Sequence, residues 1–274
     1  MLGLGTQITT LDSRILPITV NATLQSARGF VFDGVGDFLD VPDDPEFSFA
    51  TASAVGGTID EQFSFAVWVK RDANNVNDCV MSKTDLDPAG NVEYRFYFTG
   101  DDVYVDIHDT TVSNFSRHVI TNVSTTGWQH WVITYNGAPD SGIKIYLNGA
   151  YRETVSETSG GTGGDMKDGA TSFKIGRMDD TAYDFDGKMM QAVLWKCELT
   201  STEVTYLYAG GESARDPNFD SSTYGSSHAV VAWYPMDASD GNKDSSGVGA
   251  ASQVNFNSTK QGDVDLDTSD DAPW

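Results

Sequence analysis

Basic side chains are scarce in this sequence, which has 17 lysines and arginines against 40 aspartates and glutamates, a formal net charge of −23. A surface this acidic repels phosphate backbones and anionic lipid headgroups. The charge therefore excludes nucleic acids, heparin-like polymers and anionic membranes as expected partners. Long apolar runs are lacking too: none approaches the roughly 18 residues that a transmembrane helix needs, so no membrane contact is expected.

Cysteine is equally rare. The two cysteines, Cys79 and Cys197, could form one disulfide, but they provide neither a disulfide framework nor a zinc pattern, and we expect both to be buried free thiols. The opening MLGLGTQITTLDSRILPI lacks the basic start, long apolar stretch and small-residue cleavage site of a signal peptide. The expected site of synthesis and retention is therefore a cytoplasm.

Catalytic motifs are also missing. Glycoside hydrolases need two carboxylates on either side of the scissile bond, often alternating along one strand, and no Glu-x-Asp-x-x-Glu strand occurs here. Neither a G-x-S-x-G elbow nor an H-E-x-x-H helix is present. The four histidines show no metal-ligand spacing: His108, His118, His130 and His228. We expect no catalytic activity.

Alternation of apolar and polar residues is abundant, and it predicts β-strands with one buried face. In QFSFAVWVK, residues 62–70, the aromatic and aliphatic residues at odd positions face one way and Trp68 faces the other. In EYRFYFTGDDVYVDIHD, residues 93–109, two such strands flank a tight turn at Gly100. Short strands separated by turns predict an all-β sandwich or barrel.

One helix interrupts this pattern. In LTSTEVTYLYAGG, residues 199–211, Thr200 and Glu203 have the spacing of a capping box. Gly210 or Gly211 can supply the left-handed residue that ends the helix. We expect a short surface helix with a structural role.

Four stretches in chain order resemble a known family. They are GFVFDGVGDFLDVPD (29–43), FSFAVWVKRD (63–72), GWQHWVITYNG with IKIYLNGAYR (127–152), and FKIGRM with FDGKMMQAVLWKCELTSTEVTYLY (173–208). Together they resemble a laminin-G-like sandwich of the concanavalin A-like lectin/glucanase superfamily, over roughly residues 29–210. The resemblance implies an antiparallel jelly-roll β-sandwich with one short surface helix.

The segment HAVVAWYPMDASDGNKDSSGVGA, residues 228–250, usually precedes the Phe-Asp-Gly strand in this family, yet here it follows the helix. The resemblance therefore implies a permuted last strand, because the first and last strands of such sandwiches are neighbours. We expect an extended arm over residues 1–28, the sandwich over 29–254, and an acidic tail over 255–274.

A laminin-G-like body with this tail and the start MLGLG is similar to virion proteins of tailed bacteriophages, particularly marine ones. This resemblance implies a non-enzymatic structural protein of the virion, made in the host cytoplasm, which decorates the capsid or forms a fibre or knob. Its arms would attach it to other virion proteins, such as a capsid protein, and it would form symmetric homo-oligomers. The alternative is a carbohydrate-binding lectin, adhesive on a virion or extracellular.

The candidate binding face combines aromatic rings with polar side chains, as glycan sites do. Its members are Trp68, Arg95, Tyr97, Tyr104 and His108, which would share one face together with Asp106 if their strands adjoin. Protein interfaces are rich in the same residue types, so we favour packing of this face under loops or against a partner subunit over glycan binding.

Calcium is the candidate cofactor, since hard cations prefer several oxygen ligands within one loop. The first set is Asp179, Asp180, Asp184 and Asp186, and further sets are Asp33 with Asp37 and Asp240 with Asn242 and Asp244. The resembling family often carries an acidic ligand on its closing strand, where this chain has Met190 and Gln191. We therefore favour solvated acidic loops over a metal site as the interpretation of these residues.

Overall fold

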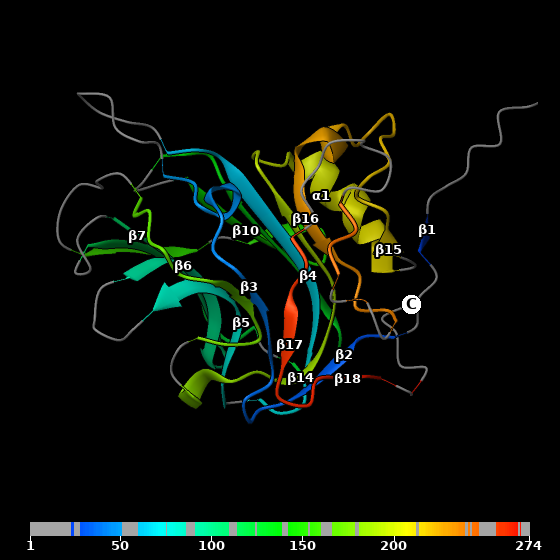
Figure 1. Cartoon of the computed structure of the whole chain (residues 1–274). Helices are drawn as coiled ribbons and strands as arrows, with labels where there is room; N and C mark the ends of the chain where they lie inside the picture. The colour runs from blue at the N-terminus through cyan, green and yellow to red at the C-terminus, as the bar shows by residue number, and fades with distance from the viewer. Residues whose placement is uncertain are drawn as a thin grey trace, which may run out of the picture.

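The structure is a computed structural model (Figure 1). It describes residues 23–24, 28–50, 60–74, 76–85, 91–109, 114–123, 125–138, 142–152, 154–159, 166–178, 181–211, 214–238, 241, 243–246, 256–267 and 269. Most of these residues belong to two packed antiparallel sheets, so the predicted antiparallel β-sandwich is confirmed.

The first sheet, called the β14 sheet here, has eight strands in the order β11-β10-β9-β4-β14-β2-β18, with β16 also paired to β14. Its strands are β2 (Phe30–Asp33), β4 (Phe63–Arg71), β9 (Gln129–Tyr135), β10 (Ile143–Leu147), β11 (Ala150–Arg152), β14 (Asp186–Trp195), β16 (Val230–Tyr234) and β18 (Asp265–Leu266).

The second sheet, the β6 sheet, has eight strands in the order β12-β8-β7-β6-β5-β13-β3-β17. Its strands are β3 (Phe38–Val41), β5 (Val76–Asp85), β6 (Asn91–Gly100), β7 (Asp102–His108), β8 (Phe115–Ile120), β12 (Val155–Ser159), β13 (Phe173–Ile175) and β17 (Thr259–Gln261). Outside both sheets, β1 (Thr23–Leu24) pairs with β15 (Ala214–Arg215). The helical elements are α1 (Ser201–Tyr208) and the 3₁₀ turns η1 (Pro45–Phe47), η2 (Thr181–Tyr183), η3 (Ala209–Gly211) and η4 (Ser226–Ala229).

The core lies between the facing sides of the two sheets, where the predicted alternation places its apolar residues. Phe96 and Phe98 of β6 pack on Trp131 of β9, with ring centroids 5.9 and 5.8 Å apart, and Phe63 and Phe65 of β4 join the same cluster. Removing these rings from water is the main stabilising contribution of such a core.

The outer face of β4 is buried as well, because α1 covers it. Trp68 is 3% exposed, and its ring stacks on Tyr208 of α1 with centroids 5.7 Å apart. The expectation that Trp68 belongs to an open binding face is therefore corrected: the helix occupies that side of the sheet.

Helix α1 begins as predicted. The Thr200 side chain accepts a hydrogen bond from the Glu203 N–H, and Glu203 in turn accepts from the Thr200 N–H at 2.9 Å. The left-handed end comes one residue earlier than expected, at Ala209 with φ 52°, and continues through Gly210 at φ 69°.

The strand order at β14 is the one that a permuted sandwich requires. On the flank of β14 opposite β4, β2 pairs with residues 186–189 and β16 pairs with residues 192–195, both antiparallel to β14. Strand β16 therefore ends beside the point where β2 begins. A chain that joined them in that order would keep the same sheet, as the permutation predicted from the resemblance requires; the permutation itself stays a prediction.

The C-terminal segment differs from the expected tail. In Figure 1 its strands β17 and β18 lie beside β3 and β2, and the ladders pair Lys260 with Leu39 and Asp265 with Val31. Backbone hydrogen bonding to two open sheet edges explains why an acidic segment is held there. The described part of residues 255–274 thus belongs to the sandwich.

Two smaller expectations concern the thiols and the membrane. Cys79 and Cys197 are both free; Cys79 is buried as expected, whereas Cys197 is only half-buried. Within the described ranges, no helix combines the length and the apolar character needed to cross a membrane.

Candidate functional site

Four of the five predicted binding residues lie together on the outer face of the β6 sheet. Odd and even positions alternate between the two faces, so the residues between core phenylalanines and valines point outward. The ladder sets Tyr97 opposite Tyr104 and Arg95 opposite Asp106, while His108 lies further along β7. Trp68 lies in the β14 sheet and is not part of this group.

Asp106 is the centre of this group. Arg117 of β8 donates from Nε to Asp106 Oδ1 at 2.7 Å and from Nη2 to Oδ2 at 2.9 Å. Arg95 donates to the same carboxylate from the other side, and the Tyr97 hydroxyl donates to Oδ2 at 3.2 Å. We call Arg95, Tyr97, Tyr104, Asp106, His108 and Arg117 the outer-face network.

Burial of Asp106 would by itself raise its pKa, because a buried charge loses its hydration. Hydrogen bonds from Arg117 and His108, and the charges of Arg95 and Arg117, outweigh this effect and hold the pKa of Asp106 well below its usual range. The carboxylate stays ionised in the pH range of most solutions, so it cannot donate a proton as a general acid.

Aromatic rings lie beside the charged residues Arg95, Asp106 and Arg117. Tyr97 and Tyr104 stack with centroids 5.3 Å apart, and Tyr183 of η2 meets Tyr97 edge-on at 5.7 Å. The Arg117 guanidinium lies 5.4 Å from the Tyr104 centroid and 4.6 Å from that of Phe115. The rings and guanidinium groups therefore hold one another in place.

Exposure decides which members can touch a ligand. The Asp106 side chain is fully buried, whereas the side chains of Arg95 and Arg117 are 14% and 21% exposed and Tyr104 is half-buried. Arg95 Nε and His108 Nδ1 are buried and have no hydrogen-bond partner within the described chain. This surface offers a tyrosine ring and guanidinium donors supported by a fixed anion.

Arg117 was missed from the sequence, although its signal was present. In FSRHVI, residues 115–120, alternation places Arg117 on the outer face, opposite to His118 and Ile120. The strand register then aligns Arg117 with Asp106. The register between strands is what brings the two together, and local alternation does not supply it.

The expected calcium loop does not form a cluster among the described residues. Asp184 accepts from the Gly36 N–H at 2.8 Å and pairs with Arg177 at 3.4 Å, and the Asp186 N–H donates to Asp78 at 3.0 Å. Asp179 and Asp180 lie outside the described residues.

The two remaining expected sets have different outcomes. Asp244 caps the backbone by accepting from the N–H groups of Trp233 and Phe256, both at 3.0 Å, while Asp240 and Asn242 lie outside the described residues. Gln191, at the family's acidic position, is 5% exposed and accepts from Trp233 Nε1 at 2.8 Å. The described members of these sets therefore form hydrogen bonds within the chain, and a calcium site there stays a prediction.

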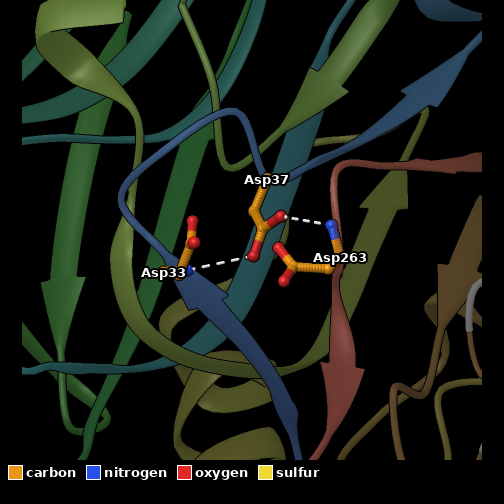
Figure 2. A group of neighbouring side chains, drawn as sticks. All are labelled: Asp33, Asp37 and Asp263. Carbon is orange, nitrogen blue, oxygen red and sulfur yellow. Dashed lines mark hydrogen bonds between the residues drawn. The ribbon is translucent and has the colours of Figure 1, made fainter.

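Asp33 and Asp37 do converge, and Asp263 of the C-terminal segment joins them (Figure 2). One carboxylate oxygen from each lies within 4.8 Å of the others. Both oxygens of Asp37 already accept backbone N–H groups, from Asp33 at 3.0 Å and from Asp263 at 2.8 Å. This donor set suits a hard cation, and it also works as a purely structural clip.

Comparisons with known proteins find one matching family and several solved structures of similar fold. Residues 36–205, more than half of the 274-residue chain, match the family described as the concanavalin A-like lectin/glucanases superfamily. No curated protein matches the sequence.

Among solved structures, a putative carbohydrate binding protein from Bacteroides ovatus has a TM-score of 0.57 and 17% identity, covering 89% of this chain and 60% of its own. The chain thus spans less than two thirds of that protein. The receptor binding domain of botulinum neurotoxin C/D mosaic serotype has a TM-score of 0.47 and 14% identity, with 70% and 44% coverage. A heptameric SAP-like pentraxin from Limulus polyphemus has a TM-score of 0.41 and 13% identity, with 77% and 92% coverage.

Proposed function

Because the chain belongs to the concanavalin A-like lectin/glucanases superfamily, we propose that it is a non-catalytic carbohydrate-binding protein. The sugar-contacting surface is the outer-face network on strands β6, β7 and β8. The observation that carries this proposal is the presentation of Tyr104 beside Arg95 and Arg117, whose guanidinium groups are held by one buried carboxylate.

The chemistry of the surface supports sugar binding. A half-buried tyrosine ring can accept the C–H face of a pyranose, and partly exposed guanidinium groups donate to hydroxyl or carboxylate oxygens. Because Asp106 fixes Arg117 through two hydrogen bonds, little side-chain entropy is lost when a ligand binds. The Bacteroides protein of the same fold, described as a putative carbohydrate binding protein, supports the same ligand class.

Neither of the two carboxyl groups with the largest pKa shifts is suited to catalysing hydrolysis. Asp106 is ionised and its carboxylate is held by hydrogen bonds from Arg95 and Arg117. Burial raises the pKa of Glu93 to about 7 against the opposing effect of Lys83, whose Nζ lies 2.6 Å from Glu93 Oε1. Glu93 is fully buried, so this carboxyl does not reach a solvent-borne glycosidic bond. A hydrolase needs two accessible carboxyl groups.

Glycan-array screening followed by calorimetry of the best ligand tests this proposal. Tyr104→Ala and Arg117→Met are expected to weaken that ligand at least about tenfold, since each removes one principal contact. Tyr151→Ala is the matched control, because Tyr151 is 55% exposed on β11 of the other sheet. If both network variants bind like wild type, or if no glycan binds, the proposal is wrong.

A structural role in a virion stays a prediction. Residues 259–261 and 265–266 pair with the protein's own sheets, which makes attachment through that part of the tail less favourable. Mass spectrometry of purified virus particles from the source culture tests this role: stoichiometric abundance would support it, and absence from the particles would reject it.

A further inference from the structure

A small cavity lies under helix α1, on the side of the β14 sheet away from the core. Its volume is about 20 Å³, and its wall combines strands β4, β9 and β14 with α1 and β15. Space of this size holds a single small occupant, such as one water or one monatomic ion. Trp68, Trp195 and Leu207 make up much of the apolar part of the wall.

Three residues that line this cavity each carry a buried nitrogen without a hydrogen-bond partner in the described part of the chain. These atoms are Gln191 Nε2, His130 Nδ1 and Arg215 Nε. Gln191 and His130 are 5% and 4% exposed. Burying a polar nitrogen without a partner costs about 1–3 kcal/mol, so three at one cavity call for a ligand.

All three atoms can act as donors. Gln191 Oε1 accepts from Trp233 Nε1 at 2.8 Å, which fixes the amide so that its NH₂ group is the unpaired end. Arg215 Nε always carries a proton, and His130 Nδ1 carries one in one of its two tautomers. A lone water accepts only two such bonds and needs acceptors for its own protons, whereas an anion accepts all three.

The charge of the cavity wall also favours an anion. The Arg215 guanidinium stacks over Tyr206 at 5.1 Å but forms no ion pair with any carboxylate of the described residues, in a chain with 40 acidic residues. None of the side chains that line the cavity is acidic. We propose that this cavity binds one halide-sized anion, chloride in ordinary solution, held by Arg215, Gln191 and His130.

Such an ion would connect β15 to strands β9 and β14 of the sheet beneath it. Gln191 lies at a β-bulge in β14, with φ 54°, and Arg215 lies on the short strand that follows the helix. The anion site is separate from the outer-face network, which lies on the other sheet, so either proposal can fail without the other.

Bromide titration of the full chain in halide-free buffer tests the site, with gluconate keeping the ionic strength constant. Bromide quenches nearby indoles, and Trp68 and Trp195 line the cavity, so we expect saturable quenching of their fluorescence. Gln191→Glu retains the acceptor for Trp233 but places a carboxylate beside Arg215. Both Gln191→Glu and Arg215→Gln are expected to weaken bromide binding about tenfold or more.

Arg152→Gln is the control, because Arg152 is exposed on β11 and its substitution changes the net charge by the same amount as Arg215→Gln. Crystals grown in bromide should show one anomalous peak inside the cavity. Equal bromide quenching in Gln191→Glu and wild type, or a water in the cavity without an anomalous peak, would overturn the proposal.

Discussion

The carboxylate of Asp37 accepts a hydrogen bond of 2.8 Å from the backbone N–H of Asp263, a residue 226 positions further along the chain. Its other oxygen accepts from the Asp33 N–H at 3.0 Å, so a single side chain joins the β2–β3 turn to the β17–β18 turn (Figure 2). Gly262 leaves room for this contact, because a Cβ there would lie 2.1 Å from Asp37 Oδ1.

Asp37→Ala is expected to release the C-terminal strands while the rest of the sandwich stays folded. The substitution removes both acceptors, and β17 and β18 are short edge strands with few other backbone bonds. Hydrogen exchange of residues 259–266 should accelerate strongly, whereas that of β4 should not change. Asp265→Asn, at an exposed position, is the control. Unchanged protection in Asp37→Ala would show that the ladders alone hold the segment.

Asp106→Asn is expected to lower the free energy of unfolding by about 3–5 kcal/mol, because it leaves Arg95 and Arg117 without their buried counter-ion. Urea unfolding measures this change. Glu198→Gln breaks the partly exposed pair with Lys144, and its expected cost is only ~0–1 kcal/mol. Equal effects of the two substitutions would contradict the central role given to Asp106.

His130 should make stability depend on pH. Burial lowers the pKa of His130 to about 3, below the ordinary value of 6.5, so the unfolded chain binds the proton more tightly. The resulting stability is present above about pH 6.5 and is lost as the pH falls towards 3, by on the order of 4 kcal/mol in total.

The measurement is urea unfolding at several pH values in halide-free buffer, comparing His130→Gln with wild type. The difference in the free energy of unfolding between wild type and His130→Gln should change between about pH 6.5 and pH 3. The exposed His228 provides the control substitution His228→Gln. Parallel profiles for His130→Gln and wild type would reject the predicted contribution of His130.

Gly187→Ala is expected to destabilise the sandwich by at least about 2 kcal/mol. Gly187 lies in the middle strand β14 at φ 142°, and a Cβ there would lie 2.2 Å from the Lys70 carbonyl oxygen. Gly225→Ala is the control, because a Cβ at Gly225 meets nothing within 4 Å. Thermal melting should separate the two variants, and equal melting temperatures would contradict this reading of the close strand approach.

Several features followed directly from local sequence. Alternation over residues 93–109 predicted the β6–β7 hairpin, and the structure confirms its turn, with Gly100 at φ 61°. The capping box at Thr200 and Glu203 is confirmed as well. These features depend on backbone conformation and on near neighbours in the chain, so a short stretch contains the information.

Other features were decided only by the tertiary structure. Alternation assigned Trp68 to an outer face but could not show that α1 covers that face. It placed Asp106 outward, but only the strand register brought Arg117 to it, and only the C-terminal strands brought Asp263 to Asp37. Periodicity determines which way a side chain points along its own strand. Which side chains contact one another depends on long-range strand pairing. These contacts in turn determine the burial and the electrostatic environment of each side chain.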